Sequence, residues 1–235
     1  MDFEGKTVVV TGVGRSGQVG EVVARWFAER GARLAVVERT RETADARAAE
    51  LRALGHDARA FACDLTVPEQ VDPVAAAVAE QLGDVDALVC MAGGFGMTGP
   101  LDASEPAAWH HQIAINLTTA YVATRAFLPA LRRRRGAIVY FASAAALPGA
   151  SVGATAAYAA AKSGVVALMH AVAQAERKGG VRANAVAPTS IRTAANEAAM
   201  GGDAAYVERE EVAAAVGWLC SAAASAVTGQ VLSLG

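Results

Sequence analysis

The chain has 235 residues, of which 54% are hydrophobic, and its formal net charge is -2. A chain of this length and composition can bury one substantial core and is compatible with a single α/β domain. The slightly acidic balance argues against a general surface for nucleic acid or for an anionic membrane, because such surfaces need an excess of Lys and Arg. We therefore expect a small-molecule partner, with no nucleic acid and no membrane.

The cysteines and the N-terminal residues indicate the compartment. Cys63, Cys90 and Cys220 are odd in number and widely spaced, so they indicate neither a disulfide framework nor a metal site. The first six residues are acidic overall and lack the basic-then-apolar pattern of a signal peptide. The segment 136–161 has no charged residue and is long enough to span a bilayer, but Pro and Gly interrupt it and much of it is Ala. We expect a cytoplasmic protein.

Short apolar runs alternate with amphipathic segments along the whole chain. The runs are rich in β-branched residues, as is typical of strands that are covered on both faces. The predicted strands cover 6–11, 33–37, 58–63, 87–91, 137–142, 182–187 and 230–234. The predicted helices cover 21–30, 43–54, 71–82, 113–134, 155–178 and 210–222. This alternation predicts an α/β fold, with a doubly wound parallel sheet of about seven strands and helices on both faces, in one domain over residues 1–235.

A glycine-rich loop directly follows the first predicted strand. Such a loop can bring backbone N–H groups and the positive end of the next helix against a pyrophosphate. A plain strand-to-helix turn needs only one or two glycines, so the four at positions 12, 14, 17 and 20 favour dinucleotide binding. The loop residues expected at the cofactor are Gly12, Gly14, Arg15, Ser16, Gly17 and Val19.

Charged residues after the second and third strands bear on the choice of cofactor. Glu38 ends the second strand, where a carboxylate can accept from both ribose hydroxyls and repel a 2′-phosphate. This favours NAD(H), but Arg39 or Arg15 could pair with a 2′-phosphate, so NADP(H) stays open. Asp64, with Leu65 beside it, would either meet the adenine or begin the next helix.

Tyr158 and Lys162 are four residues apart in a predicted helix, so the phenol and the ammonium project from one face. The chain has 18 Arg but only three Lys, and a guanidinium does not replace the compact charge of an ammonium. A nearby cation favours the phenolate, so we expect Lys162, together with an oxidised nicotinamide, to lower the pKa of Tyr158 below its usual value of about 10. A pair on a surface helix is the structural alternative.

Several motifs occur in order along the chain. Ser143 ends a strand upstream of Tyr158-x-x-x-Lys162, Asn116 stands in Ile-Asn-Leu, and the segment 181–188 forms a strand and turn. With these motifs the chain resembles the short-chain dehydrogenase/reductase family, classical type, as a divergent member over essentially its whole length. The resemblance implies a Rossmann-type fold and an NAD(P)-dependent oxidoreductase. Such an enzyme transfers a hydride between nicotinamide and a carbonyl or secondary alcohol.

The resemblance also implies a role for each of four catalytic residues. Tyr158 would be the acid and base, and Ser143 would hydrogen-bond the substrate oxygen. Lys162 would hold the nicotinamide ribose, and Asn116 would order a water that passes protons to solvent. The further cofactor contacts that it implies are Ala92, Gly93, Tyr158, Lys162, Pro188 and Ile191.

Some positions depart from the family pattern. The glycine loop has two extra residues and places Gln18 at the family's middle glycine, so we expect a locally different phosphate loop. The family's Asn-Asn-Ala-Gly turn appears as Cys90-Met91-Ala92-Gly93, which loses a polar side chain that would brace the adjacent strand. Few residues lie between Thr193 and the last helix, so we expect a short, mobile and open substrate lid at about 194–209. Such a lid would suit a bulky or carrier-bound acyl substrate, or a loosely selective enzyme.

Two further readings concern other parts of the chain. The run from Arg132 to Arg135 ends a predicted helix, where cations offset the macrodipole, so we favour that role over a polyanion site. His110 and His111 are expected to be solvated or packed rather than catalytic.

Two further predictions concern the oligomeric state and an alternative function. The resemblance implies a homotetramer or a homodimer. A catalytically weak or inactive sensor or scaffold with the same dinucleotide-binding fold is the alternative function, because the glycine loop is altered. The intact set of Ser143, Tyr158 and Lys162 argues for the enzyme.

Overall fold

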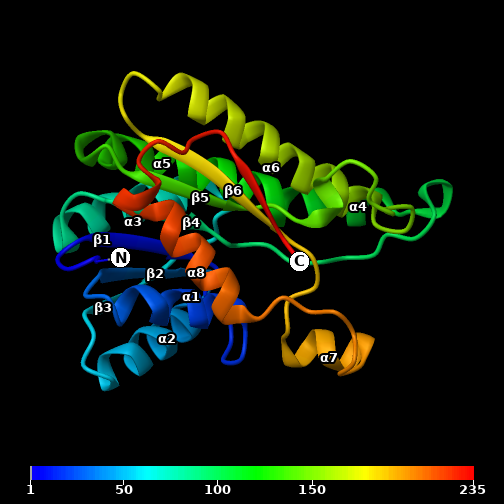
Figure 1. Ribbon diagram of the computed structural model, residues 1–235, viewed down its shortest axis with the longest axis horizontal. Coiled ribbons are helices and arrows are strands. Elements are labelled where there is room, and N and C mark those ends of the chain that lie inside the picture. Colours follow the sequence, from blue (N-terminus) through cyan, green and yellow to red (C-terminus); the bar gives the residue numbers. More distant parts are fainter. Residues whose placement is uncertain (1) are drawn as a thin grey trace.

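The computed structural model describes residues 2–235 and shows a seven-stranded parallel sheet covered by helices on both faces (Figure 1). The sheet has the order β3-β2-β1-β4-β5-β6-β7. Its strands are β1 (Thr7–Thr11), β2 (Arg33–Glu38), β3 (Ala58–Ala62), β4 (Ala87–Cys90), β5 (Ala137–Phe141), β6 (Arg182–Pro188) and β7 (Val231–Leu234). The helices are α1 (Val19–Ala28), α2 (Arg41–Ala53), α3 (Pro68–Leu82), α4 (Pro106–Ile113), α5 (Thr119–Arg134), α6 (Ala156–Ala175), α7 (Ala194–Met200) and α8 (Arg209–Cys220). The predicted doubly wound sheet in a single domain is confirmed.

Each face of the sheet has its own hydrophobic core. Val8 and Val10 of β1 point to the face that α1, α2 and α8 cover, whereas Val9 points to the face of α3, α5 and α6. All five residues of β1 are buried, because this strand is covered on both sides. The apolar runs of the sequence are therefore central strands rather than half-exposed ones.

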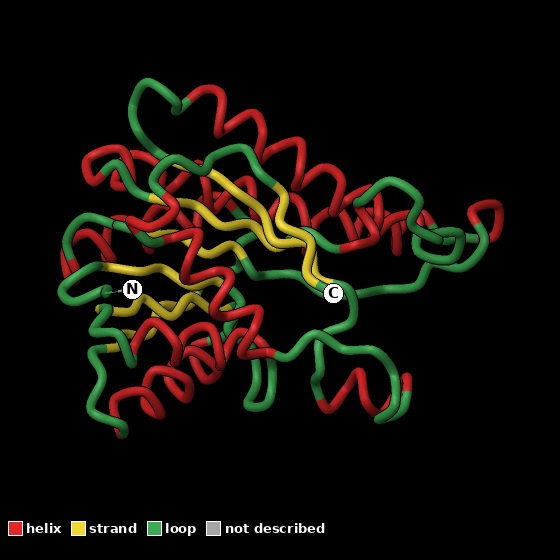
Figure 2. The backbone as a smooth tube through the Cα atoms, in the orientation of Figure 1, coloured by secondary structure: helices red, strands yellow, loops and turns green. Residues whose placement is uncertain are grey.

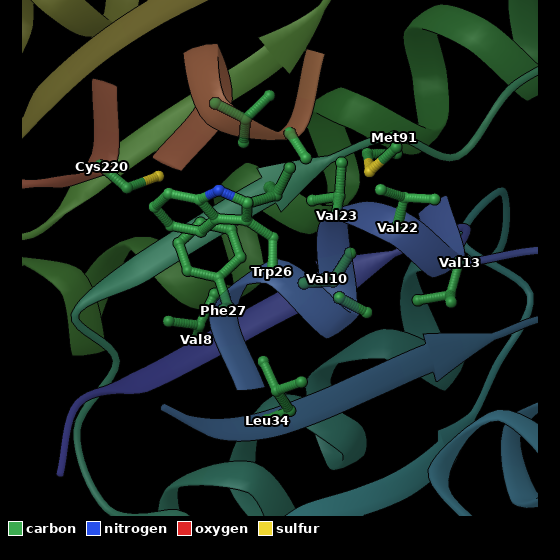
Figure 3. Close-up of a cluster of buried hydrophobic side chains, with 14 of the residues drawn as sticks. Val8, Val10, Val13, Val22, Val23, Trp26, Phe27, Leu34, Met91 and Cys220 are labelled. Atoms are coloured by element: carbon green, nitrogen blue, oxygen red, sulfur yellow. The ribbon is translucent and has the colours of Figure 1, made fainter. Parts of the chain in front are cut away.

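The first core is built around Trp26 of α1. Its ring meets Phe3 edge to face, with ring centroids 5.9 Å apart. It also meets Phe27 edge to face, at 5.2 Å (Figure 3). Gly217 of α8 faces the same indole, and a Cβ at this position would collide with the ring. The absence of a side chain at Gly217 thus allows α1 and α8 to pack closely.

The long helix expected over 113–134 is the element that differs most from the prediction. Helix α4 begins earlier, at Pro106, and a π-helical turn, Ala114–Thr118, joins it to α5. The expected segment is therefore the last residue of α4, the turn and α5. Asn116 lies inside this turn, where the backbone hydrogen bonding departs from the α-helix.

The arginine run lies at the C-terminus of α5, as predicted. Arg132 forms an ion pair with Glu176, Arg133 with Asp84 and Arg134 with Asp86. These acidic partners neutralise three of the four cations, which supports the structural reading of the run.

Helix α6 is the one helix in the described part of the chain that is long and apolar enough to cross a bilayer by length and composition. In this structure α6 packs against α4 and β6, and Val165, Met169 and Ala173 belong to the second core.

The strand order defines where a site can form. β1 lies between β2 and β4, so the chain leaves the two neighbours β1 and β4 in opposite directions across the sheet. The loops that follow the parallel strands gather at one end, where the C-terminus also lies (Figure 2). In open α/β sheets a crevice forms at this point, outside the carboxyl ends of the strands.

Candidate active site

A cleft of about 640 Å³ opens at the carboxyl ends of β1, β2, β3 and β4. It brings together nine of the residues predicted from the sequence to bind the cofactor: Gly12, Gly14, Arg15, Glu38, Arg39, Asp64, Leu65, Ala92 and Gly93. The remaining predicted residues, Ser16, Gly17, Val19, Pro188 and Ile191, and also Tyr158 and Lys162, do not line it. The residues that line the cleft thus all lie between positions 12 and 119. Three of the four proposed catalytic residues, Ser143, Tyr158 and Lys162, lie further along the chain.

Two glycines allow the loop after β1 to approach its neighbours. Gly12 has a φ of +72°, and a Cβ on it would lie 2.5 Å from the Cα of Ala92, in the loop after β4. Gly20 lies in the first turn of α1 against the backbone of Val13, with no room for a Cβ. The first glycine therefore lets the loop after β1 pack against the loop after β4, and the last one lets α1 pack against the backbone of Val13.

The residues between these two glycines are held by carboxylates of the chain itself. The Gly14 N–H donates to Oε1 of Glu38 at 2.7 Å, and the Gly17 N–H donates to Oε2 of Glu21 at 2.6 Å. Arg209, at the start of α8, donates to the Gly17 carbonyl at 2.9 Å. The two-residue insertion falls in a turn at Ser16 and Gly17, where the Gln18 N–H donates to the Arg15 carbonyl at 3.2 Å, and neither residue lines the cleft.

Glu38 and Asp64 both line the cleft, and their pKa values are shifted in opposite directions. Burial raises the pKa of Glu38, partly offset by hydrogen bonds from the backbone of Gly14, Arg39 and Val13. Hydrogen bonds from the Thr66 hydroxyl and N–H, at 2.6 Å and 2.8 Å, lower the pKa of Asp64. Asp64 therefore both lines the cleft and shapes the turn before α3, so neither expectation for it excludes the other.

The sequence reasoning missed other residues that line the cleft: Val37, Thr40, Thr43, Cys63, Thr66, His111, Ala114, Ile115 and Thr119. His111 was expected to be solvated or packed; it is exposed and faces the cleft. His111 and Ile115 are four residues apart, so helical spacing ahead of Asn116 was the signal that could have found them.

Ser143, Tyr158 and Lys162 meet at the carboxyl end of β5. Ser143 caps the short turn after β5, where its Oγ accepts from the Ala145 N–H at 3.2 Å, and it lies close enough to Tyr158, in the first turn of α6, to act on the pKa of that phenol. Lys162 is one helical turn further, is only 6% exposed, and its Nζ donates to the Phe141 carbonyl at 2.8 Å. Nζ lies 5.8 Å from the centroid of the Tyr158 ring. The fold thus gathers these three predicted catalytic residues.

The electrostatics of this group correct one expectation. Burial raises the pKa of Tyr158, and the hydrogen bond from Ser143 offsets only part of this shift. Burial also lowers the pKa of Lys162 to about 8. The expected lowering of the tyrosine pKa by the neighbouring cation is therefore wrong for the protein chain alone, because desolvation outweighs it and the ammonium bonds to a backbone carbonyl.

Asn116 is buried behind the site. Its Nδ2 donates to the Gly94 carbonyl at 3.0 Å, and its Oδ1 accepts from the Gly94 N–H at 3.1 Å. Nδ2 also lies within hydrogen-bond distance of the backbone and side-chain oxygens of Gln112. The amide of Asn116 thus fixes the segment after β4, and its implied role in ordering a water stays a prediction.

The altered turn after β4 is braced by the neighbouring strand. The Thr11 hydroxyl accepts from the N–H groups of Met91 and Ala92, at 3.2 Å and 3.4 Å. On the neighbouring strand β5, Tyr140 pairs with Cys90 and shares a buried hydrogen bond of 2.8 Å with Thr124. Hydroxyl groups therefore support the turn in which the family's asparagines are missing.

The expected lid region contains a helix and a hydrogen-bonded base. Ile191 forms a β-bridge with Val207, and Arg192 forms ion pairs with Glu208 and Glu197. Helix α7 lies between these ends, and the Tyr206 hydroxyl donates to the Gly201 carbonyl at 2.7 Å. The region over 194–209 is thus more structured than the open covering expected from its composition.

Among residues 2–235, no group of three His, Cys, Asp or Glu side chains is placed to hold a metal ion. The strand order and the cleft at its reversal point instead define a Rossmann-type α/β protein.

Comparison with known proteins identifies the family. Residues 6–202 match the family model described as short chain dehydrogenase. D-threitol dehydrogenase from Mycolicibacterium smegmatis is 34% identical, over 97% of this chain and 90% of that protein. Cis-4-hydroxycyclohexanecarboxylate dehydrogenase from Sinomonas cyclohexanicum is 35% identical, over 99% and 96%. The 3-oxoacyl-[acyl-carrier-protein] reductase of Vibrio cholerae is 31% identical, over 99% and 96%.

Solved structures agree with this result. A gluconate 5-dehydrogenase from Burkholderia cenocepacia, in complex with NADP and tartrate, superposes with a TM-score of 0.91 at 28% identity, over 99% of this chain and 94% of that one. An NAD+-bound xylitol dehydrogenase gives 0.90 at 25% identity, over 100% and 99%. The chain belongs to the short-chain dehydrogenase/reductase family and is an oxidoreductase of that family.

Proposed function

We propose that this protein transfers a hydride between NAD(P) and a carbonyl or secondary alcohol substrate, with Tyr158 as the acid and base. The observation that carries this proposal is the group at the end of β5, where Ser143 ends the strand beside Tyr158 and the buried Lys162 lies one helical turn away. The cofactor, when bound, supplies or accepts the hydride and in its oxidised form carries a positive charge.

The residues of the cleft fit a dinucleotide. A volume of about 640 Å³ lies in the range of ligand pockets, and Gly12 is one of the residues that line it. Glu38 presents a carboxylate at the end of β2, where a ribose can donate to it. Glu38 favours NAD(H), and we propose it as the preferred cofactor. Arg15 and Arg39 line the same cleft and keep NADP(H) as the second candidate.

The protonation states of the site favour reduction near neutral pH. Because burial raises its pKa, Tyr158 keeps its proton at pH 7 and can donate it to a carbonyl oxygen. The Ser143 hydroxyl, which lies beside Tyr158, would orient the same oxygen. Lys162, with a pKa of about 8, is mostly charged at pH 7 and is available to hold the nicotinamide ribose. Alcohol oxidation needs the phenolate and should accelerate as the pH rises.

The named relatives act on polyols, cyclic alcohols and carrier-bound acyl groups, so they support a carbonyl or alcohol substrate in general. A carrier-bound acyl substrate is the second candidate in this class. The cytoplasmic location and the homodimeric or homotetrameric state remain predictions.

The test of the proposed function compares Tyr158→Phe with Tyr121→Phe, which removes the hydroxyl of a half-exposed tyrosine on α5. Both variants are first titrated with NADH and NADPH by fluorescence to show that the fold binds cofactor. Turnover is then measured on a panel of carbonyls and alcohols. We expect Tyr158→Phe to lose at least about 100-fold in kcat and Tyr121→Phe to keep full rate. Full turnover by Tyr158→Phe refutes the proposed mechanism, and a wild type that binds NADH without any turnover supports the sensor or scaffold.

A further inference from the structure

Phe95 is an exposed aromatic residue in contact with the proposed catalytic tyrosine. Its side chain is 68% exposed, although large apolar side chains are usually buried. Its ring meets the Tyr158 ring edge to face, with centroids 5.2 Å apart and planes at 73°. The contact leaves most of the Phe95 ring free beside the hydroxyl that is expected to exchange the proton.

The backbone around Phe95 is fixed on its N-terminal side. Asn116 bonds both the N–H and the carbonyl of Gly94. Gln112, which is 5% exposed, packs so closely on Gly96 that a Cβ there would collide with its amide. Two buried amides from α4 and the π-helical turn therefore hold the glycines on either side of Phe95.

The backbone is also fixed on its C-terminal side. The N–H groups of Thr98 and Gly99 donate to the carbonyl of Ala154, at 2.9 Å and 3.2 Å. Ala154 lies just before α6, the helix that carries Tyr158. The segment from Gly94 to Gly99 thus bridges the end of β4 and the start of α6, and it presents Phe95 at a defined place.

Two other exposed apolar side chains, one in this segment and one just after it, can be compared with Phe95. Met97 and Leu101 are exposed to the same degree as Phe95, at 69% and 67%. Among the aromatic contacts of the described residues, only that of Phe95 reaches Tyr158. These three side chains share a high exposure, and among them Phe95 is the aromatic one, whose ring meets the Tyr158 ring edge to face.

We propose that Phe95 is a specificity residue that packs against the apolar ring of a cyclic substrate while the carbonyl or hydroxyl of that ring meets Tyr158. An alicyclic or aromatic ring gains contact and loses water against a phenyl face, whereas an open-chain polyol must give up hydration there. The inference rests on the proposed function and names the substrate class of the same site.

The experiment compares Phe95→Ala with Leu101→Ala, which shortens an equally exposed side chain just after the segment. The rate of NADH oxidation is measured with cyclohexanone and with erythrulose, a four-carbon keto-polyol. We expect Phe95→Ala to lower kcat/KM for cyclohexanone about tenfold or more, mainly through KM, and to change that for erythrulose less than about twofold. Leu101→Ala should change neither. An equal loss on both ketones, an altered pH profile of kcat without a change in selectivity, or no loss overturns the proposal.

A binding measurement decides the proposal even if no ketone is turned over. Calorimetric titration of cyclohexanone into the NADH complex of Tyr158→Phe, with and without Phe95→Ala, removes catalysis from the readout. An increase of Kd of about tenfold on loss of the Phe95 ring supports the contact, and an unchanged Kd refutes it. Absence of turnover by wild type, with this Kd effect present, would instead refute the proposed function alone.

Discussion

Replacement of Lys162 by Met tests the electrostatics of the site through stability. The ammonium is 6% exposed, and burial lowers its pKa from 10.5 to about 8. Because the unfolded chain holds this proton more tightly, the charged lysine costs the folded protein about 3 kcal/mol at pH 7. This cost is fully present below pH 8 and disappears as the pH rises through 10.5. The contribution of Lys162 to the free energy of unfolding therefore rises between pH 8 and pH 10.5.

Lys162→Met keeps a side chain of similar length and removes the titration. It also leaves the Phe141 carbonyl without its donor, which costs about 1–3 kcal/mol and offsets much of the gain at pH 7. The absolute difference at one pH is thus small, and the pH dependence carries the information. The free energy of unfolding of wild type minus that of Lys162→Met should rise by about 2–3 kcal/mol between pH 7 and pH 10.

The measurement is urea unfolding at fixed protein concentration, followed by tryptophan fluorescence, since Trp26 lies in the core. Lys178→Met, which removes an exposed ammonium, is the control for the loss of one lysine. A wild-type-minus-variant difference that stays flat or falls as the pH rises would show that Lys162 is not desolvated in the folded protein, and the reasoning about its charge at the site would fail with it.

Two more predictions concern the cleft. Gly20→Ala should destabilise the fold by about 1–3 kcal/mol and weaken NADH binding, because a Cβ would collide with the Val13 backbone; Gly153→Ala, with open space at its Cβ, should do neither in unfolding and titration experiments. Glu38→Gln should raise the affinity for NADPH relative to NADH about tenfold in fluorescence titration, because the carboxylate that repels a 2′-phosphate is lost. Glu42→Gln, nearby on α2, should leave this ratio unchanged, and an unchanged ratio in Glu38→Gln would remove the argument for NAD(H).

The sequence predicted the sheet because its signal is local and strong. Buried parallel strands such as β1 are continuous apolar runs, and every expected strand bound lies within one residue of the observed one. Helices α4 and α7 gave no such signal. Gln112 is the one buried residue of α4 and α7 has none, so neither has an apolar face to detect. Pro106 at the start of α4 was the available signal for its true beginning.

The candidate site was predictable where one motif carries the residues and unpredictable where distant segments meet. Tyr158 and Lys162 are one turn apart in α6, so their joint position follows from spacing. Arg209 reaches Gly17 across most of the chain, and no local pattern marks that contact. The prediction for the pKa of Tyr158 was wrong for a similar reason. The direction of the pKa shift depends on burial by the assembled fold, whereas the sequence shows only the neighbouring cation.

The raised pKa of Tyr158 changes the protonation state in which the site rests. A tyrosine with a lowered pKa would rest as a base, but burial keeps Tyr158 protonated, with the Ser143 hydroxyl beside it. Phe95 covers part of the same ring and adds to its apolar surroundings. Lys162, bound to the Phe141 carbonyl, is one turn away rather than in direct contact with the phenol. The chain alone therefore prepares a proton donor, which suits carbonyl reduction, and the reverse reaction requires either alkaline pH or the positive charge of the oxidised cofactor to release that proton.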